Sequence, residues 1–405
     1  MWEQIRSNQI RSVVLVTLMA ALLLAIGYAL GVAFLNSAVA GLVIAAIVWG
    51  IMNLIALFQG DSIILGMSGA RKIGPQDHPR LYNVVEEMKI ASGLPKMPDV
   101  YIIDDPALNA FSTGRSPDHA AVAITSGLLE KLNRDELQGV IGHEVGHIQN
   151  RDIRLMMLAS VLLGAIVILA YYASRVIFFT GVSGGGRRDS KGGGGAGMAQ
   201  LIILAVGIVL IILAPIFAQL IYFAISRRRE YLADASSALY TRYPEGLASA
   251  LEKLENNNTQ VKTANKATAP MYISNPFWKK GMSVSEPFAT HPPIQERVRI
   301  LRAMSGASLA DYERAYEKAK GNKIVPDSAL SGAAAVEKRA ANTTEAGDIQ
   351  EMVDRKRDTS DVLWRMSNYR TLNCENCGTT LRLPPSYDQP LVRCPHCGHV
   401  NRVEN

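Results

Sequence analysis

The chain has 405 residues, enough for two or three domains, with 48% hydrophobic residues, 19% charged residues and a net charge of +6. This composition is shifted toward that of membrane proteins. All four cysteines lie in the last 32 residues, which excludes a fold stapled throughout by disulfides and removes any need for an oxidising compartment.

Two uncharged apolar runs follow the N-terminus. Residues 13–35 and residues 38–58 provide 23 and 21 positions, and a bilayer-spanning helix needs about 20. A cleaved signal peptide is the competing interpretation, because Ala38-Val39-Ala40 has the small residues of a cleavage site. However, the first run is too long for the apolar part of a signal peptide, and the second follows at once. We therefore expect residues 1–60 to form a transmembrane hairpin that turns at Asn36-Ser37.

The next segment, residues 61–154, mixes helix and strand patterns. "HPRLYNVVEEMKIASG" is typical of an amphipathic helix stopped by Gly93, and "DVYIID" and "AAVAIT" are typical of short strands. Asn133 and Glu136, three residues apart, form a capping-box pattern that opens a second helix. We expect this helix to carry "VIGHEVGHIQNRD" and to continue into the next apolar run.

Two later apolar runs predict a second transmembrane hairpin over residues 155–226. The first covers residues 155–172, and the second covers residues 198–225, where Pro215 is tolerated as a kink. The stretch "GVSGGGRRDSKGGGGAG" between them cannot build a core and is typical of a flexible loop. The sequence therefore predicts four transmembrane helices.

Basic residues flank the apolar runs and bear on the orientation of the chain. They are Arg6, Arg11, Arg151, Arg154 and Arg227 to Arg229. The positive-inside rule places the ends that carry them in the cytoplasm. Arg187, Arg188 and Lys191 in the glycine-rich loop favour the opposite orientation.

The motif HEVGH places His143 and His147 four residues apart, so both lie on one face of a helix. Two imidazole nitrogens in this arrangement can bind one zinc ion, and Glu144 can take a proton from water activated there. The alternative is a surface histidine pair beside a helix glutamate. A tetrahedral zinc held by two histidines and a water lacks one ligand.

The missing ligand is sought in "SRRREYLADASSALY", directly after the fourth apolar run. Glu230 and Asp234 share a helical face there. Glu230 can reach the metal, and Asp234 can accept the ring N–H of His143 or His147. The alternative for Glu230 is neutralisation of the three neighbouring arginines. If both later runs cross the bilayer, His147 and Glu230 meet on the same side of the membrane.

With these motifs, the sequence resembles the HtpX-type membrane metallopeptidases, which are relatives of the CAAX prenyl endopeptidase. The resemblance covers about residues 1–305 and rests on "HEVGH", "RRREYLAD", "NAFSTG" and "THPPIQER". It implies a gluzincin fold with His143, His147 and Glu230 as zinc ligands. It also implies that Glu144 is the base, and that damaged or misassembled membrane proteins are cut at the cytoplasmic face. The glycine-rich loop and the last hundred residues depart from the typical member, which leaves the substrate range open.

The "NAFSTG" stretch begins with Asn109, Ala110 and Phe111. In related peptidases this region forms a strand edge that holds substrate, and an edge can bind an extended peptide through main-chain bonds. An ordinary hairpin tip is the alternative. The other histidines of this segment, His78 and His119, have no partner pattern and are interpreted as surface residues.

His291 in "THPP" is the remaining candidate for chemistry. It can donate a hydrogen bond to the tetrahedral oxyanion, or replace Glu230 as the third ligand, although the family pattern favours the glutamate. A loop histidine held by the two prolines is the alternative without a function. Arg297 can orient either His291 or Asp234.

The tail contains two C-x-x-C pairs, "CENCG" and "CPHCG", with zinc-ribbon spacing. Its four thiolates, from Cys374, Cys377, Cys394 and Cys397, complete a closed structural zinc site, and redox pairing is the alternative. Residues 371–405 hold three arginines against three acidic residues, so nucleic acid is not the expected partner, and protein binding is favoured.

We therefore expect a mainly α-helical integral membrane protein with a zincin-like α+β catalytic domain, and one catalytic and one structural zinc ion. The two parts of that domain are residues 61–154 and 227–305, followed by a helical or partly disordered spacer over 306–370 and the ribbon over 371–405. The expected function is endoproteolysis of membrane proteins, in a multi-pass protein of a bacterial-type inner membrane whose catalytic domain faces the cytoplasm. The rival is a membrane-anchored zinc scaffold that recruits partners through its ribbon.

Overall fold

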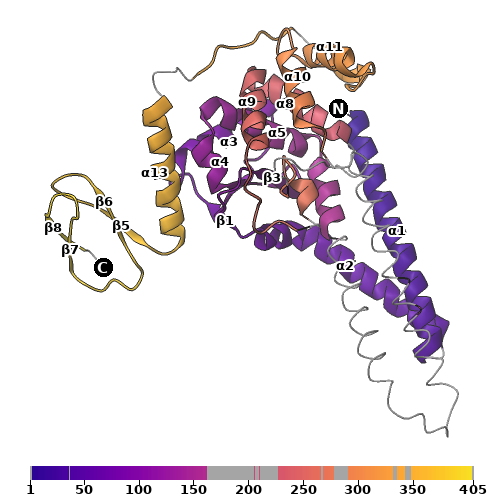
Figure 1. Cartoon of the computed structure of the whole chain (residues 1–405). Coiled ribbons are helices and arrows are strands. Elements are labelled where there is room, and N and C mark those ends of the chain that lie inside the picture. Colours follow the sequence, from indigo (N-terminus) through magenta and orange to yellow (C-terminus); the bar gives the residue numbers. More distant parts are fainter. Residues whose placement is uncertain are drawn as a thin grey trace, which may run out of the picture.

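The structure is a computed structural model and describes residues 2–35, 37–161, 205, 209, 227–265, 268–277, 291–331, 335–342 and 348–403. Its helices include α1 (Trp2–Leu35), α2 (Ala38–Met67), α3 (Pro79–Ser92), α4 (Ser126–Lys131), α5 (Arg134–Gln149), α8 (Arg227–Thr241), α9 (Pro244–Glu255), α10 (Ile294–Arg302), α11 (Leu309–Lys320), α12 (Asp327–Leu330) and α13 (Asp348–Met366), with a 3-10 turn at Ala269–Met271. Its strands are β1 (Ala70–Ile73), β2 (Asp99–Ile103), β3 (Ala110–Ser116), β4 (His119–Thr125), β5 (Arg370–Asn373), β6 (Thr380–Leu383), β7 (Leu391–Arg393) and β8 (Val400–Arg402). Figure 1 shows α1 and α2 side by side, extending away from the other helices, and the strands β5 to β8 on the far side of α13.

The two N-terminal apolar runs form the helices α1 and α2, which pack against each other as a helical hairpin. The Ser37 hydroxyl caps α2 by accepting a main-chain N–H at 3.2 Å. The helices approach closely at two glycines, because a Cβ on Gly31 would lie 2.6 Å from the Cα of Gly41. Residues Arg6–Ala25 and Ala38–Met67 are long and apolar enough to cross a membrane. The third and fourth predicted spans lie largely outside the described residues.

The main sheet has the strand order β1-β2-β4-β3. β2 runs parallel to β4, while β1 and β3 run antiparallel to their neighbours, which leaves β3 at an edge beside α5. The strands expected from "DVYIID" and "AAVAIT" are β2 and β4, and the expected amphipathic helix is α3, which ends at Ser92 and is capped by Gly93. The capping box of α5 also forms, with Asn133 and Glu136 each accepting the other's main-chain N–H.

His78 is buried, so its interpretation as a surface residue is wrong. Its side chain is 1% exposed, and its Nδ1 accepts the N–H of Leu81 at 3.2 Å as the N-cap of α3. Histidine is not among the usual capping residues, so the sequence pattern gave no signal for this role. His119 is exposed, as expected.

The buried cap predicts a pH-dependent stability. Burial, and then the charge of Arg80, lowers the pKa of His78 from 6.5 to about 4. As the pH falls below 6.5, the unfolded chain gains a proton on His78 before the folded chain does, so stability is lost between pH 6.5 and 4. The loss amounts to about 1.4 kcal/mol per pH unit. Thermal unfolding at pH 7 and pH 5 should show a smaller difference for His78→Asn, which keeps a capping acceptor, than for the wild type. An equal difference in both proteins would contradict this account.

The segment expected as a spacer, residues 306–370, packs against earlier elements along much of its described length. Tyr312 of α11 is fully buried. Arg339 donates to Asp135 at the start of α5 at 2.7 Å, and Arg365 at the end of α13 donates to a main-chain oxygen just before α3 at 2.7 Å. This segment is therefore tied to the earlier part of the chain by helix packing and by hydrogen bonds from Arg339 and Arg365.

Candidate metal centre

Two glycines of α5 let neighbouring helices approach it closely. A Cβ on Gly139 would lie 2.5 Å from the main-chain nitrogen of Leu247 in α9. A Cβ on Gly146, inside the HEVGH motif, would lie 3.0 Å from the Cβ of Ser236 in α8. The short distance between α5 and α8 brings Glu230 opposite the histidines of α5.

Three potential metal ligands converge between these helices. His143 and His147 lie one turn apart on α5, with 3.2 Å between their Nε2 atoms. Glu230 places its two oxygens 3.7 Å and 3.6 Å from those atoms. The three side chains are buried, and their ligand atoms all lie within 4.8 Å of one another. Two imidazoles and one carboxylate form the donor set of an open zinc site.

The hydrogen bonds of the two rings show why a cation fits here. Nδ1 of His143 bonds Asp234, and Nδ1 of His147 bonds Asp152, each at 2.9 Å. A carboxylate accepts, so each Nδ1 carries a hydrogen, and in the neutral ring each Nε2 keeps the lone pair that binds a metal ion. Burial alone would lower the pKa of His143, but Asp234 and Glu230 outweigh it and raise the pKa to about 9. The cluster favours a positive charge, which a divalent metal ion supplies.

Asp234 is held in place by Arg297 of α10. The guanidinium donates from Nε to Oδ2 at 2.8 Å and from Nη2 to Oδ1 at 2.6 Å, and both side chains are fully buried. Burial would raise the pKa of Asp234, but Arg297 lowers it, so the carboxylate stays charged. Asp234 therefore hydrogen-bonds His143, and Arg297 hydrogen-bonds Asp234 rather than His291.

Asp152, the partner of His147, does not follow from the sequence pattern, which predicts that α5 continues into the third apolar run. That expectation is wrong. α5 ends at Gln149, Arg151 has a φ of 58°, and the chain becomes helical again over residues 152–161. In an unbroken helix Asp152 would point about 140° away from His147, since each residue turns the helix by about 100°. The break at Arg151 turns the carboxylate back to the ring.

Glu144 lies between α5 and the edge strand β3. It is fully buried, and its Oε2 accepts the hydroxyl hydrogen of Ser112 at 2.7 Å. Its Oε1 has no hydrogen-bond partner among the residues that the structure describes. A carboxylate with one oxygen held and one open is suited to take up a proton. Ser112 was also missed, although it belongs to the "NAFSTG" stretch.

His291 lies beside Glu230 rather than among the converging ligands. Its Nδ1 is 3.2 Å from Oε2 of Glu230, whereas the ligand group within 4.8 Å consists of Glu230 and the two HEVGH histidines. Together with Asn109 and Ile273, it lines a cavity of about 250 Å³. The geometry therefore favours Glu230 as the third ligand and leaves the His291 ring facing the space beside it.

Asn109 directly precedes the edge strand β3, and Ala110 and Phe111 begin it, but part of their outer main chain is already bonded. The main-chain oxygen of Ala110 accepts the N–H of Ile273 at 2.9 Å. Alternate residues of a strand turn their N–H and C=O groups to the same side, so Ser112 and Gly114 are next along this edge. Within the described ranges, no segment pairs with Ser112 on that outer side. The open part of the edge therefore begins next to Glu144.

Comparison with known proteins places this centre in a family. The model of peptidase family M48 matches residues 75–305, which include every residue of the centre described so far. The protease HtpX homologs of Streptococcus pneumoniae strains Hungary19A-6 and P1031 are each 46% identical over 304 residues, which is 75% of this chain and 100% of theirs. The chain belongs to peptidase family M48. It is a metalloprotease, and members of this family use zinc.

A solved structure is also similar to this M48 protease. The crystal structure of S. mikatae Ste24p has 19% sequence identity and a TM-score of 0.42. The match covers 74% of this chain and 67% of that one. The family model ends at residue 305, so the helices from α11 onward and the cysteine pairs lie beyond it.

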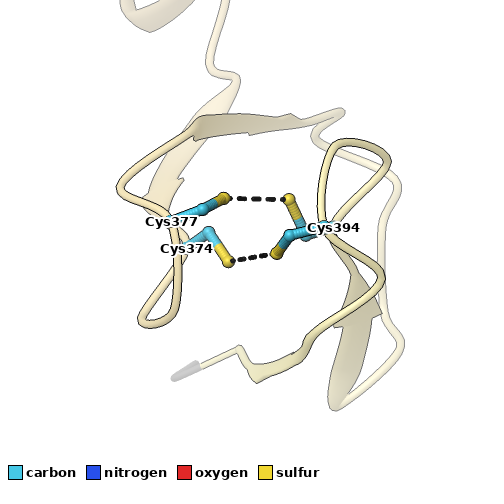
Figure 2. Close-up of side chains that lie close together, drawn as sticks. Cys374, Cys377 and Cys394 are labelled. Carbon is cyan, nitrogen blue, oxygen red and sulfur yellow. Dashed lines mark hydrogen bonds between the residues drawn. The ribbon is translucent and has the colours of Figure 1, made fainter.

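The four cysteines of the tail also converge. They come from the hairpins β5–β6 and β7–β8, and Figure 2 shows Cys374, Cys377 and Cys394 directing their sulfur atoms into the space between the two hairpins. The Sγ atoms of Cys374 and Cys397 are 3.5 Å apart, and those of Cys377 and Cys394 are 3.7 Å apart. The glycine after each second cysteine has a φ of 70° or 76°, the left-handed conformation that glycine adopts readily. Four free thiols so arranged fit a tetrahedral zinc site.

Proposed function

We propose that this M48 protease uses zinc to hydrolyse peptide bonds in misfolded or damaged membrane proteins at the cytoplasmic face of a bacterial-type inner membrane. The observation that carries the proposal is the position of the metal centre beside α1. Asn8 of α1 bonds Asp152, the partner of His147, only five residues before the uncharged run that begins at Val13. A site at this level meets substrates where they leave the bilayer. Basic residues such as Arg6 at the same end favour the cytoplasmic side.

The residues of the site divide the chemistry among them. When bound by His143, His147 and Glu230, zinc polarises the scissile carbonyl and makes water more acidic. Glu144 takes the proton of the attacking water on its open oxygen and passes it to the leaving amine. His291 donates a hydrogen bond to the oxyanion that develops on the carbonyl oxygen.

The edge strand β3 is the proposed substrate platform. The sequence pointed to Asn109, Ala110 and Phe111, and because Ile273 already bonds Ala110, the proposed platform starts at Ser112, beside the base Glu144. An extended peptide that pairs with the main chain of β3 is held with little regard to its side chains. Such binding suits a protease whose substrates share damage rather than a sequence.

The experiment compares the new protein N-termini that appear in membranes of cells producing the wild type or Glu144→Gln. The proposal expects fragments of membrane proteins that depend on Glu144, with cuts in cytoplasmic segments near membrane spans. A membrane-anchored zinc scaffold predicts the same fragments with both proteins. Cuts confined to soluble proteins or to the other side of the membrane would contradict the proposed substrate class or orientation.

The cysteine cluster is proposed to hold a second, structural zinc ion, in a ribbon that binds another protein rather than nucleic acid. The changes Cys374→Ser and Cys377→Ser together should remove one zinc ion per chain and unfold the ribbon, because so small a module has little core without its metal. Cleavage of a short unstructured peptide should continue at close to the wild-type rate. Metal analysis and a peptide assay check both points, and loss of peptide cleavage would show that the two sites are not independent.

A further inference from the structure

Each histidine ligand is backed by a carboxylate, and each carboxylate is held by a second donor. Behind His143, the donor that holds the carboxylate of Asp234 is Arg297 of α10. Behind His147, Asp152 accepts Nδ1–H of the ring on Oδ2 at 2.9 Å and the side-chain amide of Asn8 on Oδ1 at 2.5 Å. Asn8 belongs to the membrane helix α1 and lies 144 residues from Asp152 in the sequence. Each histidine ligand is therefore backed by a carboxylate and a donor, but the donor behind His147 comes from the membrane hairpin.

The position of Asn8 makes it hard to replace by water. Asn8, Asp152 and His147 are at most 3% exposed. The amide nitrogen of Asn8 also donates to the main-chain oxygen of Asn150 at 3.3 Å, so it holds both the break after α5 and the carboxylate that follows the break. Without this amide, Oδ1 of the buried Asp152 carboxylate would lose the hydrogen-bond donor that directs the carboxylate toward His147.

We propose that Asn8 makes α1 part of the metal centre, because it positions Asp152 and, through Asp152, holds His147 in the orientation that binds zinc. The inference rests on the proposed zinc site and adds a positioning residue from a membrane helix. Its consequence is that zinc affinity depends on how α1 is seated against residues 150–152. A change in how the α1–α2 hairpin packs should then lower the zinc affinity, although the ligands themselves are unchanged.

The test measures the affinity of the full-length protein in detergent for its more weakly held zinc ion, by competition with a chelator. Asn8→Ala should weaken this affinity about tenfold, the scale found when an outer partner of a ligand is lost. Ser12→Ala is the matched control, because Ser12 is buried one turn further along α1 and donates to the main-chain oxygen of Asn8 at 2.9 Å. Its affinity should stay within about twofold of the wild type, since Asp152 keeps its donor.

A double-mutant cycle with Asp152→Ala separates positioning from a general loss of structure. If Asn8 acts through Asp152, Asn8→Ala weakens zinc binding in the wild type and adds no further loss in the Asp152→Ala background. Equal losses in both backgrounds, or an unchanged affinity in Asn8→Ala, would overturn the proposal. Should Asn8→Ala not fold, Asn8→Ser takes its place with the same expectations, because a serine side chain is too short to reach Asp152.

Zinc affinity is measured without substrate, which keeps this inference separate from the proposed function. A protein that cleaves nothing, yet loses zinc affinity in Asn8→Ala through Asp152, would contradict the proposed function and support the role of Asn8. If the protein cleaves membrane substrates but the wild type and Asn8→Ala bind zinc with the same affinity, the result would support the proposed function and contradict the role of Asn8.

Discussion

Glu144→Gln is expected to lower the rate of peptide cleavage at least about a hundredfold while zinc stays bound. Glutamine keeps the size and shape of the side chain and can still bond Ser112, but it cannot take a proton from water. Because Glu144 is not among the three converging ligands, the metal content should not change. The measurement pairs the turnover of an unstructured peptide with metal analysis of the same preparation.

Glu86→Gln is the matched control for the base, since it makes the same chemical change at an exposed position on α3. It should cleave at the wild-type rate. Undiminished cleavage by Glu144→Gln would remove this residue from the mechanism. Loss of zinc in Glu144→Gln would mean instead that Glu144 helps to hold the metal.

Glu230→Ala is expected to empty the catalytic site and abolish cleavage. The wild type should carry two zinc ions per chain, by the geometry of its two ligand clusters, and this variant should carry one, in the ribbon. Two imidazoles alone hold zinc weakly, so the loss of affinity should exceed the roughly 10–100-fold that follows loss of an outer partner. Metal analysis after brief dialysis against a chelator measures the difference.

His291→Ala and His119→Ala are the comparisons for the ligand assignment. His291→Ala should keep two zinc ions and lose about a hundredfold in rate, the scale for one oxyanion donor. His119→Ala removes an exposed histidine and should change neither quantity. If His291→Ala loses zinc and Glu230→Ala retains it, the assignment of the third ligand is reversed.

Local spacing predicted the parts of the site that depend on one helix. The four-residue interval of HEVGH puts His143 and His147 on one face whatever surrounds the helix, and the capping pattern at Asn133 fixes where that helix begins. Glu230 was within reach of prediction because its helix follows an apolar run that can return the chain to the same side of the membrane. These features need no knowledge of tertiary contacts.

Contacts that depend on one unusual torsion or on distant residues were not predictable. Asp152 reaches His147 because Arg151 adopts a positive φ, which no periodic pattern signals. Asn8 reaches Asp152 across 144 residues, from a helix whose composition indicates only a membrane span. The composition of residues 306–370 is that of a spacer, and the bond from Arg339 to Asp135 becomes visible only in the folded chain.

The most direct test of the zinc protease is a titration of zinc into the chelator-stripped, full-length protein while cleavage of an unstructured peptide is recorded. We expect no cleavage without metal, followed by a rate that rises with occupancy of the site formed by His143, His147 and Glu230. Glu144→Gln should take up the same amount of zinc and stay inactive. Cleavage by the stripped protein, or recovery of cleavage by Glu144→Gln, would contradict the account.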